Sequence, residues 1–354
     1  VLFRSSAYVW SPMTAATIAD QYKRLLMGFA ETTGDVNKVF TQAGDFSMRG
    51  MGSPETAYRT AGGHLLSFGV SATLSVREYL KSYYHAKSDV MMYTPSTEHS
   101  VMCSYGDDEV EAFRHLITNV YPSGNISIVS DTYDLWHVVD HVLPQLKDII
   151  MARAGKVVIR PDSGDPVKII CGDAESDRST VQKGIVERLY ELFGGTTNSK
   201  GFKELDSHIG VVYGDSITVD RANKICQALL DKGFASTNTI LGIGSYTYQY
   251  VTRDTFGFAL KGTAEIVNGE FKAIQKRPAT DTGNFKKSQK GMVAVVFEHD
   301  ELRLIDNLNP QTVAELENRN LLRECYLNGE FIHTSSFEEI RNRLKTETIR
   351  VYGK

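Results

Sequence analysis

The chain has 354 residues, of which 42% are hydrophobic and 23% are charged. This length provides for about two ordinary domains, or one large α/β barrel with an appended piece, and the composition excludes disordered and fibrous proteins. The formal net charge is −4 without a long run of one sign, so neither a nucleic-acid surface nor a polybasic membrane anchor is expected.

Cysteine usage and the absence of targeting signals favour a reducing compartment. The four cysteines lie far apart in the sequence and form no C-x-x-C pair, which argues against a zinc site and a disulfide framework. No stretch reaches the roughly 18 apolar residues of a membrane span, and no signal-peptide pattern opens the chain. We therefore expect a cytoplasmic protein.

The start at Val1, without a helix N-cap, indicates an N-terminally shortened chain.

A short apolar run, a polar or glycine-containing tip and an amphipathic stretch recur along the chain, which predicts repeated strand-loop-helix units. The apolar runs are Val39–Phe40, Val90–Tyr93, Ile126–Val129, Val157–Ile159, Ile209–Tyr213 and Thr239–Leu241. Because these runs are continuous and do not alternate, they are typical of parallel strands covered on both faces by helices. An α/β barrel or a doubly wound sheet follows.

Two helix starts can be predicted from capping residues. Asp165 precedes Pro166, and Thr218 precedes an apolar stripe that ends near Gly233. After residue 291 the pattern changes to strand-like segments at Met292–Phe297, Leu302–Ile305 and 324–327, followed by a late helix at 336–344. We expect a helical lead-in over 1–42, an α/β barrel domain over 43–265 and a C-terminal antiparallel α+β region over 266–354.

Polar residues collect where the predicted strands end. In α/β barrels the chemistry lies at the carboxyl ends of the strands, so these residues should converge. They mix cationic, anionic and anion-cradling groups, which favours a site for a metal-bridged phosphate compound, although each one alone is equally explained as a solvated loop residue. They are Asp45, Arg49, His99, Ser130, Asp134, Arg160, Asp162, Asp215, Gly244 and Ser245.

Further signals are weaker. Gly242–Ser245 is similar to a phosphate-cradling turn, a pattern that many turns share. Arg253 and Lys261 either add charge to the same phosphate or lie on a solvated helix face. His99 beside Glu98 is either a phosphoacceptor oriented by a carboxylate or a hydrogen-bonded loop residue.

Several motifs in a fixed order carry a family resemblance. They are Asp45–Gly50 with Ser53–Ala57, Glu98–Ser100, Ser130–Asp134, Ile159–Gly164, Gly214–Asp215 and Thr252–Asp254. In order and spacing they resemble the nicotinamide phosphoribosyltransferases, which are type II phosphoribosyltransferases. The resemblance covers nearly the whole chain, although family members carry a further N-terminal portion. It implies an irregular, TIM-like α/β barrel with a second α+β domain, working as a homodimer with active sites at the subunit interface.

The implied reaction condenses nicotinamide with phosphoribosyl pyrophosphate to nicotinamide mononucleotide and pyrophosphate, in NAD salvage. The resemblance also implies Mg²⁺ as cofactor and ATP as an activating co-substrate that acts through a phosphohistidine. Two alternatives stay open. One is a nicotinate phosphoribosyltransferase, and the other is an inactive, shortened barrel that serves as a binding or dimerisation module.

The resemblance assigns substrate contacts to several residues. Phe46 matches the aromatic side chain that stacks on the base, and Arg160 the residue near the carboxamide. Asp162, the expected catalytic carboxylate, and Asp215 match groups that hold the ribose, with Gly214 beside them. Positions around the ribose phosphate are matched by Arg49, Arg253, Gly244 and Ser245, with Ser130 nearby.

The resemblance also assigns the metal and the ATP chemistry. Asp134 and Asp162 are the expected Mg²⁺ ligands. His99 matches the histidine that ATP phosphorylates, and Glu98 would orient it. The expected contacts to nucleotide phosphates are Lys261, Lys276 and Lys286.

This chain departs from the family pattern at three points. Gly44 stands where a His commonly precedes the Asp-Phe pair, and a Tyr that stacks on the base from the opposite subunit has no counterpart. Ala72 falls where the nicotinamide enzymes carry an Asp that accepts a hydrogen bond from the amide. Because Ala72 is closer in character to the uncharged residues of the nicotinate enzymes, nicotinate is the second substrate to consider.

Overall fold

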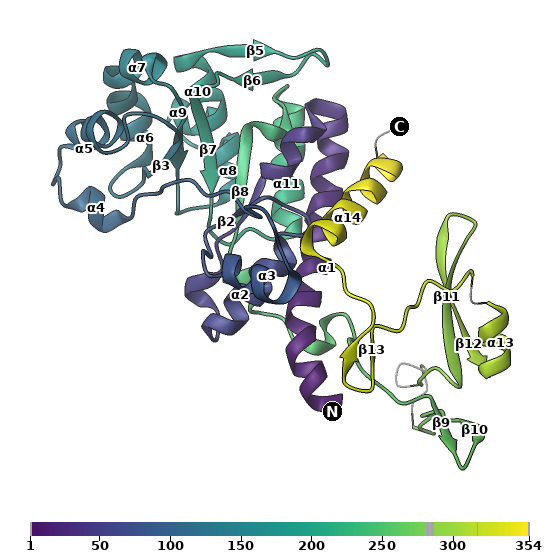
Figure 1. Ribbon diagram of the computed structural model, residues 1–354. Helices are drawn as coiled ribbons and strands as arrows, with labels where there is room; N and C mark the ends of the chain where they lie inside the picture. The colour runs from purple at the N-terminus through teal and green to yellow at the C-terminus, as the bar shows by residue number, and fades with distance from the viewer. Residues whose placement is uncertain (1, 281–282, 284–286, 317, 353–354) are drawn as a thin grey trace. The chain divides into compact units, whose positions relative to one another are not determined.

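The computed structural model describes residues 2–280, 283, 287–316 and 318–352, and the chain divides into two compact units (Figure 1). Unit 1 comprises Val1–Tyr8 and Gly257–Ser335, and unit 2 comprises Val9–Phe256 and Ser336–Lys354.

A six-stranded sheet forms the centre of unit 2, and every pair of neighbouring strands in it is parallel. Its strands are almost completely buried because apolar or very small residues occupy nearly every position, which confirms the predicted α/β class. In spatial order they are β2 (Val70–Ser71), β1 (Ala43–Asp45), β8 (Thr239–Ile243), β7 (Ile209–Tyr213), β4 (Val157–Arg160) and β3 (Ile126–Val129).

The expectation of a TIM-like barrel is met only in part, because the hydrogen-bonded ladder is a curled sheet with two edges. An extended segment, residues 92–97, links these edges through isolated bridges. It pairs with β2 at Met92 and with β3 at Ser96. The Met92 N–H donates to the Gly69 carbonyl at 2.7 Å, and the Ser127 N–H donates to the Pro95 carbonyl at 2.8 Å. Pro95 has no N–H to donate, so a continuous strand does not form here.

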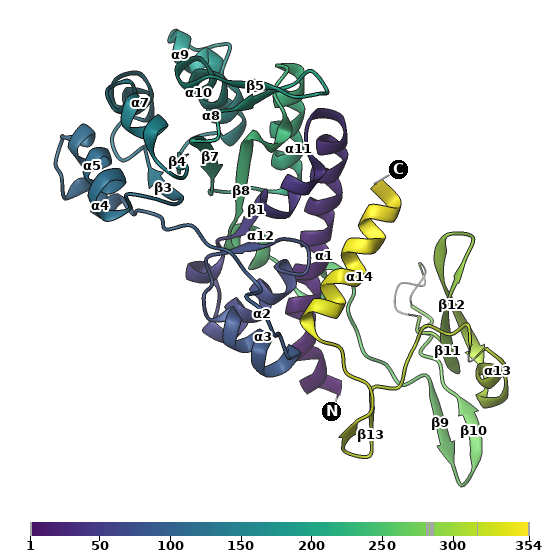
Figure 2. The same ribbon diagram turned by 45° about the horizontal axis from the view of Figure 1, so that its top comes forward.

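Helices surround the sheet, and Figure 2 shows α5, α7, α8, α10 and α11 around β3, β4, β7 and β8. None of the described helices is long and apolar enough to cross a membrane. The long first helix is α1 (Leu2–Thr33), whose Tyr22 hydroxyl donates to the Ile217 carbonyl at 3.0 Å. The others that contribute to unit 2 are α2 (Pro54–His64), α3 (Val76–Tyr84), α4 (His99–Cys103), α5 (Glu109–His115), α6 (Leu135–His137), α7 (Leu143–Ala152), α8 (Pro166–Cys171), α9 (Ser179–Lys183), α10 (Ile185–Phe193), α11 (Val219–Asp231), α12 (Ser245–Tyr248) and α14 (Phe337–Tyr352), and a short hairpin joins β5 (Gly195–Thr197) to β6 (Lys203–Leu205).

Both predicted helix starts are confirmed. The Asp165 carboxylate accepts hydrogen bonds from the N–H groups of the first turn of α8, and the Thr218 hydroxyl accepts from the Arg221 N–H at the start of α11. Gly233 follows the end of α11 with φ of +73°, a left-handed conformation that glycine adopts without steric cost.

Two predicted strands are wrong. Val39–Phe40 lies in a 3₁₀ turn (Val36–Thr41), because the Asp35 carboxylate caps that turn by accepting from the Asn37 N–H, and β1 begins only at Ala43. Val90–Tyr93 contributes a single bridge residue, Met92, to the sheet.

The strands of unit 1 form antiparallel hairpins. The first pairs β9 (Ala264–Val267) with β10 (Glu270–Ala273). The predicted strands after residue 291 are confirmed as β11 (Met292–Glu298) and β12 (Glu301–Leu308), followed by α13 (Pro310–Glu315) and the pair β13 (Tyr326–Leu327) and β14 (Glu330–Phe331). The predicted late helix is α14 in unit 2.

Candidate active site

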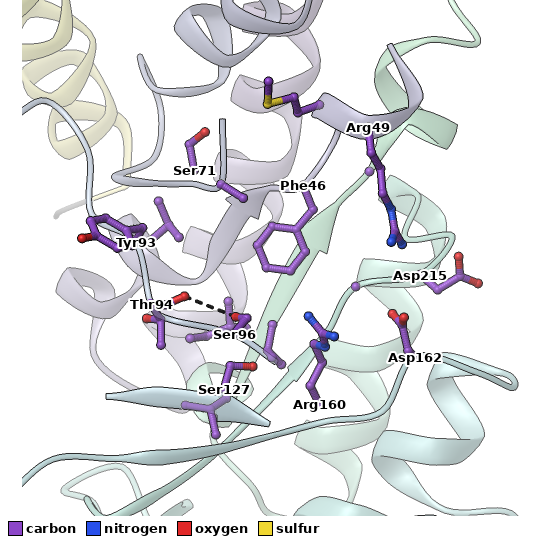
Figure 3. Close-up of a pocket in the computed structure, with 18 of the residues that line it drawn as sticks. Phe46, Arg49, Ser71, Tyr93, Thr94, Ser96, Ser127, Arg160, Asp162 and Asp215 are labelled. Carbon is purple, nitrogen blue, oxygen red and sulfur yellow. Dashed lines mark hydrogen bonds between the residues drawn. The ribbon is translucent and has the colours of Figure 1, made fainter. Parts of the chain in front are cut away.

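A cavity of about 490 Å³ lies at the carboxyl ends of the strands of unit 2 (Figure 3). It is lined by ten of the residues that the sequence singled out, and these end or follow five of the six strands, β1, β2, β4, β7 and β8, except Glu98, which follows the linking segment. They are Phe46, Arg49, Ala72, Glu98, Arg160, Asp162, Gly214, Asp215, Gly244 and Ser245. Of the ten strand-end residues predicted to converge, Arg49, Arg160, Asp162, Asp215, Gly244 and Ser245 line this cavity, whereas Asp45, His99, Ser130 and Asp134 do not.

Glycines make room for the Phe46 ring in the cavity. A Cβ atom at Gly242 would lie 2.5 Å from the Phe46 ring and 2.7 Å from the Cα atom of Gly214, and one at Gly214 would lie 3.1 Å from the same ring. Because real side chains essentially never approach to 2.5 Å, Gly242 on β8 leaves the space that the ring occupies, and a side chain at Gly214 would require the ring to shift by a few tenths of an ångström. The ring thus presents an aromatic surface on which a flat base can stack.

Charged groups gather on one side of Phe46. Figure 3 shows Arg49, Asp215, Asp162 and Arg160 on that side, with Ser71 on the other. Arg160 donates through Nη2 to the Thr97 carbonyl at 2.7 Å, whereas its buried Nε has no partner in the described part of the chain. The arrangement places cations and carboxylates next to an aromatic face, as recognition of a phosphorylated sugar and a base requires.

The turn after β1 lies against the start of α12. A Cβ atom at Gly50 would lie 2.1 Å from the Ser245 hydroxyl, so only glycine permits this approach. The same approach brings Arg49 and Ser245 to one wall of the cavity, where a guanidinium and a hydroxyl can contact an anion.

Carboxylates concentrate around the ends of β4 and β7. Burial raises the pKa of Tyr213 well above its ordinary value, and the nearby carboxylates raise it further. They belong to Asp215, Asp131, Asp162 and Asp165. The resulting negative potential suits a cation bound with its phosphates or a positively charged sugar.

His99 lies at the edge of this acidic region. Its Nε2 is 3.7 Å from the Asp162 carboxylate, and its Nδ1 is hydrogen-bonded to the Thr132 hydroxyl at 3.1 Å. The imidazole is 43% exposed, so it is open to a second ligand from solvent. Asp131 supports this arrangement because its carboxylate accepts from the Asp162 N–H at 2.8 Å and from the Ser163 hydroxyl at 2.6 Å.

Some expected residues lie away from the cavity lining. Ser130 is buried and its hydroxyl donates to the Ile128 carbonyl at 2.7 Å. Asp134 caps α6 and pairs with Arg178 at 3.3 Å. Burial alone would raise the pKa of Asp134, but hydrogen bonds from the Trp136 N–H and from Arg178 bring it below its ordinary value.

The other expected cations that the structure describes are also outside the lining. Arg253 belongs to a short 3₁₀ turn of unit 2 and pairs with Asp254. Lys261 and Lys276 belong to unit 1. Lys286 lies outside the described residues.

The cavity also contains residues that the sequence analysis missed. Ser71 and Ser127 line it, as do Tyr93, Thr94 and Ser96 of the linking segment. Ser127 had a detectable signal, since it is a polar residue between Ile126 and Ile128 in a predicted strand. Its buried hydroxyl has no partner among the described residues.

The residues present fit a magnesium ion that arrives with a phosphorylated substrate. Mg²⁺ is commonly bound through one or two carboxylates, with water and substrate phosphates completing its coordination. Asp162 and Asp215 can supply such oxygens at the cavity. In the described part of the chain, no group of three or more His, Cys, Asp or Glu side chains could hold a metal alone.

Comparison with known proteins agrees with the site. Residues 41–330 match the family model described as the nicotinate phosphoribosyltransferase (NAPRTase) family. The chain is 46% identical over 348 residues to a nicotinamide phosphoribosyltransferase of Acinetobacter baylyi, which covers 96% of this chain and 68% of that protein. The proteins of the same name from Mycoplasma pneumoniae and Mycoplasma genitalium are 40% and 35% identical, over 77% and 80% of this chain and 58% and 60% of theirs.

The chain thus spans about three fifths to two thirds of the length of these curated relatives. The resemblance drawn from the motifs is confirmed by their names and by the family match. The chain belongs to the nicotinate phosphoribosyltransferase family, and the relatives it matches are nicotinamide phosphoribosyltransferases.

Proposed function

We propose that the protein transfers the phosphoribosyl group of phosphoribosyl pyrophosphate to nicotinamide, forming nicotinamide mononucleotide and pyrophosphate in NAD salvage. One observation carries this proposal. A single cavity joins the aromatic face of Phe46 to two arginines, Arg49 and Arg160, and two carboxylates, Asp162 and Asp215. The names of the relatives support the same reaction.

The residues divide the charges of this reaction between them. When the bond between C1 of the ribose and the pyrophosphate breaks, positive charge develops on the sugar and negative charge on the leaving group. Asp162 and Asp215 would stabilise the sugar, while Arg49 and Ser245 would bind phosphate oxygens. Bound Mg²⁺, held through Asp162, would neutralise the pyrophosphate. Asp134, which lies outside the cavity lining, stays a proposed second ligand, because each of its oxygens accepts one hydrogen bond, from Trp136 or Arg178, and has a further lone pair for the metal.

The reaction is tested by incubating the purified protein with nicotinamide, phosphoribosyl pyrophosphate and Mg²⁺ and measuring nicotinamide mononucleotide. Arg49→Ala should lower kcat/KM for phosphoribosyl pyrophosphate about 10-fold or more, the effect of losing a charge-assisted contact to phosphate. Its melting temperature without ligand should be unchanged. Failure of the wild type to form a mononucleotide from any pyridine base would favour the binding or dimerisation module.

Nicotinate is the second candidate base, and one observation favours it. Ala72 lines the cavity, so no carboxylate is present at that position to repel the nicotinate carboxylate or to accept from the nicotinamide amide. We propose that nicotinamide is preferred, but with less discrimination than an Asp would give. Ala72→Asp should raise the nicotinamide to nicotinate ratio of kcat/KM about 10-fold. An unchanged ratio would show that Ala72 does not face the base, and exclusive use of nicotinate by the wild type would replace our proposal.

ATP coupling through His99 is a further part of the proposal. Its exposure and its position 3.7 Å from Asp162 support a phosphoacceptor next to the site of pyrophosphate release. With ATP and Mg²⁺ the protein should acquire an acid-labile phosphoryl group, which His99→Ala should lose and His141→Ala, at an exposed position, should retain. Labelling that persists in His99→Ala would overturn this assignment.

We also infer that the curled sheet, closed by residues 92–97, is the irregular barrel of the family, and that the protein works as a homodimer. Exposed Met48 and Tyr246 line the cavity, which supports a partner subunit over the opening. Light scattering should give twice the chain mass, and Tyr246→Asp should shift the protein towards the monomer. The four free cysteines support a cytoplasmic location.

A further inference from the structure

Asp45, the last residue of β1, is completely buried behind the wall of the cavity. One carboxylate oxygen accepts from the Ser47 N–H at 3.1 Å and from the Ser47 hydroxyl at 2.6 Å. The other accepts from the Ser71 hydroxyl at 2.9 Å and from the Thr73 hydroxyl at 2.7 Å. Four donors converge on two oxygens, which is the acceptor-only role of an ionised carboxylate.

No cation of the described residues is paired with this charge. Among the described residues, no ion pair includes Asp45. Burial lowers the pKa of the nearby His64 although the Asp45 charge opposes this, so the imidazole is neutral at pH 7. Burial likewise keeps Tyr248 neutral by raising its pKa. Arg341 is directed to backbone carbonyls. The negative charge is therefore compensated by dipoles alone.

The charge lies next to the base end of the cavity. Phe46 follows Asp45 in sequence, and the Ala72 N–H donates to the Asp45 carbonyl at 2.9 Å. Phe46, Ser71 and Ala72 all line the cavity. Because the Ser71 hydroxyl donates to the Asp45 carboxylate, a single side chain connects the carboxylate to the cavity. Ser71 lies across Phe46 from Arg49 and Asp215 (Figure 3), which separates this charge from the groups proposed for the phosphates and the sugar.

The proposed reaction creates a cation where the base binds. The lone pair of the pyridine nitrogen forms the bond to C1 of the ribose, the bond from C1 to the pyrophosphate oxygen breaks, and its electron pair leaves with the pyrophosphate. The nitrogen gains a formal positive charge and the base becomes a pyridinium. A fixed anion favours that charge over the neutral base, and it acts more strongly in a buried setting than in water.

We propose that Asp45 is a positioning residue that fixes Phe46 and the Ser71–Thr73 turn, and whose buried charge makes the cavity selective for the pyridinium form of the base. This inference rests on the proposed function. It explains why a carboxylate without a cation is kept in the core, where an unpaired charge is ordinarily destabilising. It also distinguishes Asp45 from a purely structural group, which would not sense the charge of the ring.

The test compares two ligands that differ in ring charge. Nicotinamide mononucleotide carries a pyridinium, and its reduced 1,4-dihydro form carries a neutral ring with the same ribose phosphate. In Asp45→Asn the amide can donate to the Ser71 and Thr73 hydroxyls, so the shape is kept and the charge is removed. Calorimetry on the purified protein should show the ratio of affinities, pyridinium form over dihydro form, falling about 10-fold relative to wild type, equivalent to about 1.4 kcal/mol.

Two controls separate charge from packing. Thr73→Val removes one hydroxyl from the carboxylate but leaves its charge, so both affinities should change together and the ratio should not fall. Asp220→Asn removes a charge from an exposed position on α11 and should change neither affinity. If Asp45→Asn does not fold, Asp45→Ser removes the same charge and retains a hydroxyl for the network.

An equal loss for both ligands, or no loss for either, would overturn the proposed role of the charge. That result is distinct from failure of the proposed function, because there the wild type itself would neither bind nicotinamide mononucleotide nor form it.

Discussion

At the scale of single residues, the cavity is marked by polar atoms that lack partners within the described structure. The Ser127 hydroxyl and the Arg160 Nε are both buried and have no partner among the residues that the structure describes. A buried polar atom without a hydrogen bond destabilises the folded protein unless water or a ligand supplies the partner. Both residues line the cavity, so the ligand is the expected partner.

Removing the Ser127 hydroxyl should separate binding from stability. Ser127→Ala eliminates an unsatisfied group, so the melting temperature without ligand should stay constant or rise slightly. The KM for nicotinamide should increase about 5-fold to 10-fold if the base supplies the missing hydrogen bond. Steady-state kinetics and thermal melts on the same preparation measure both. A clear fall in the melting temperature would instead indicate a structural hydrogen bond.

His64 should make stability depend on pH. Its Nδ1 is hydrogen-bonded to the Tyr248 hydroxyl at 2.7 Å, and burial lowers its pKa below the ordinary value of about 6.5. As the pH falls through 6.5 the unfolded chain binds a proton that the folded chain does not, so the free energy of unfolding decreases. Between pH 7.0 and 5.5, wild type should lose about 1 kcal/mol more than His64→Gln.

Urea unfolding at the two pH values measures this difference. Ionisable groups that both proteins contain contribute equally to the two losses in free energy of unfolding, so their contributions cancel in the comparison. His141→Gln serves as a control that removes an exposed imidazole. Equal losses in wild type and His64→Gln would show that the folded protein protonates His64 readily.

Strand patterns predicted the site residues that directly follow a recognisable strand, and the family resemblance added others such as Phe46 and Ala72. Arg160 and Asp162 come after the apolar run of β4, and Gly214 and Asp215 come after that of β7. Ser71 comes from a segment without a strand pattern, and Tyr93 ends the run Val90–Tyr93, which was wrongly predicted as a strand, so nothing marked either as a site residue. The role of Asp45 depends on hydroxyls from Ser71 and Thr73, 26 and 28 residues away, and only the folded structure brings these together.

At the scale of elements, one arginine of α14 links three separate parts of unit 2. The Arg341 guanidinium donates to the carbonyls of Leu65 at 2.6 Å and Val90 at 2.7 Å, and it lies over the Phe337 ring at 4.6 Å. Burial lowers its pKa to about 10, so it is still a cation at neutral pH. Val90 leads into the segment 92–97 that joins the edges of the sheet, so α14 supports that junction.

Arg341→Lys should therefore destabilise the protein although it keeps the charge. A single ammonium cannot reproduce the planar fork that reaches several carbonyls, so we expect a loss of about 2 kcal/mol in the free energy of unfolding. Arg343→Lys, at an exposed position on the same helix, should be neutral. Denaturant unfolding of both variants gives the comparison. Similar stabilities would mean that the Arg341 contacts contribute little.

The elements that sequence reasoning found and missed differ in length and composition. β3, β4, β7 and β8 contain four or five residues and are rich in Val and Ile, which is a clear strand signal. β1 is Ala-Gly-Asp and β2 has two residues, so neither carries an apolar run. The pairing of β1 and β2 is set by neighbouring strands and by the hydrogen bonds to the Asp45 carboxylate. The strand propensity of their own residues contributes little.

At the scale of the whole molecule, the cavity belongs entirely to unit 2. All its lining residues fall within Val9–Phe256, and unit 1 has its own antiparallel hairpins. A ligand that binds only the folded cavity stabilises the cooperative unit that contains it, by about 2.7 kcal/mol when its concentration is 100 times Kd. Regions outside that unit gain no protection by this route.

Hydrogen exchange with nicotinamide mononucleotide should show this localisation. We expect slower exchange in β4 and in residues 92–97, which contain lining residues, in β1, which leads into Phe46, and in the loop 71–73 that holds Asp45. The hairpins β9–β10 and β11–β12 of unit 1 should exchange at the same rate with and without ligand. Mass spectrometry of peptides resolves both groups. Protection in the hairpins of similar size to that in unit 2 would show that the two units respond to the ligand as one cooperative body.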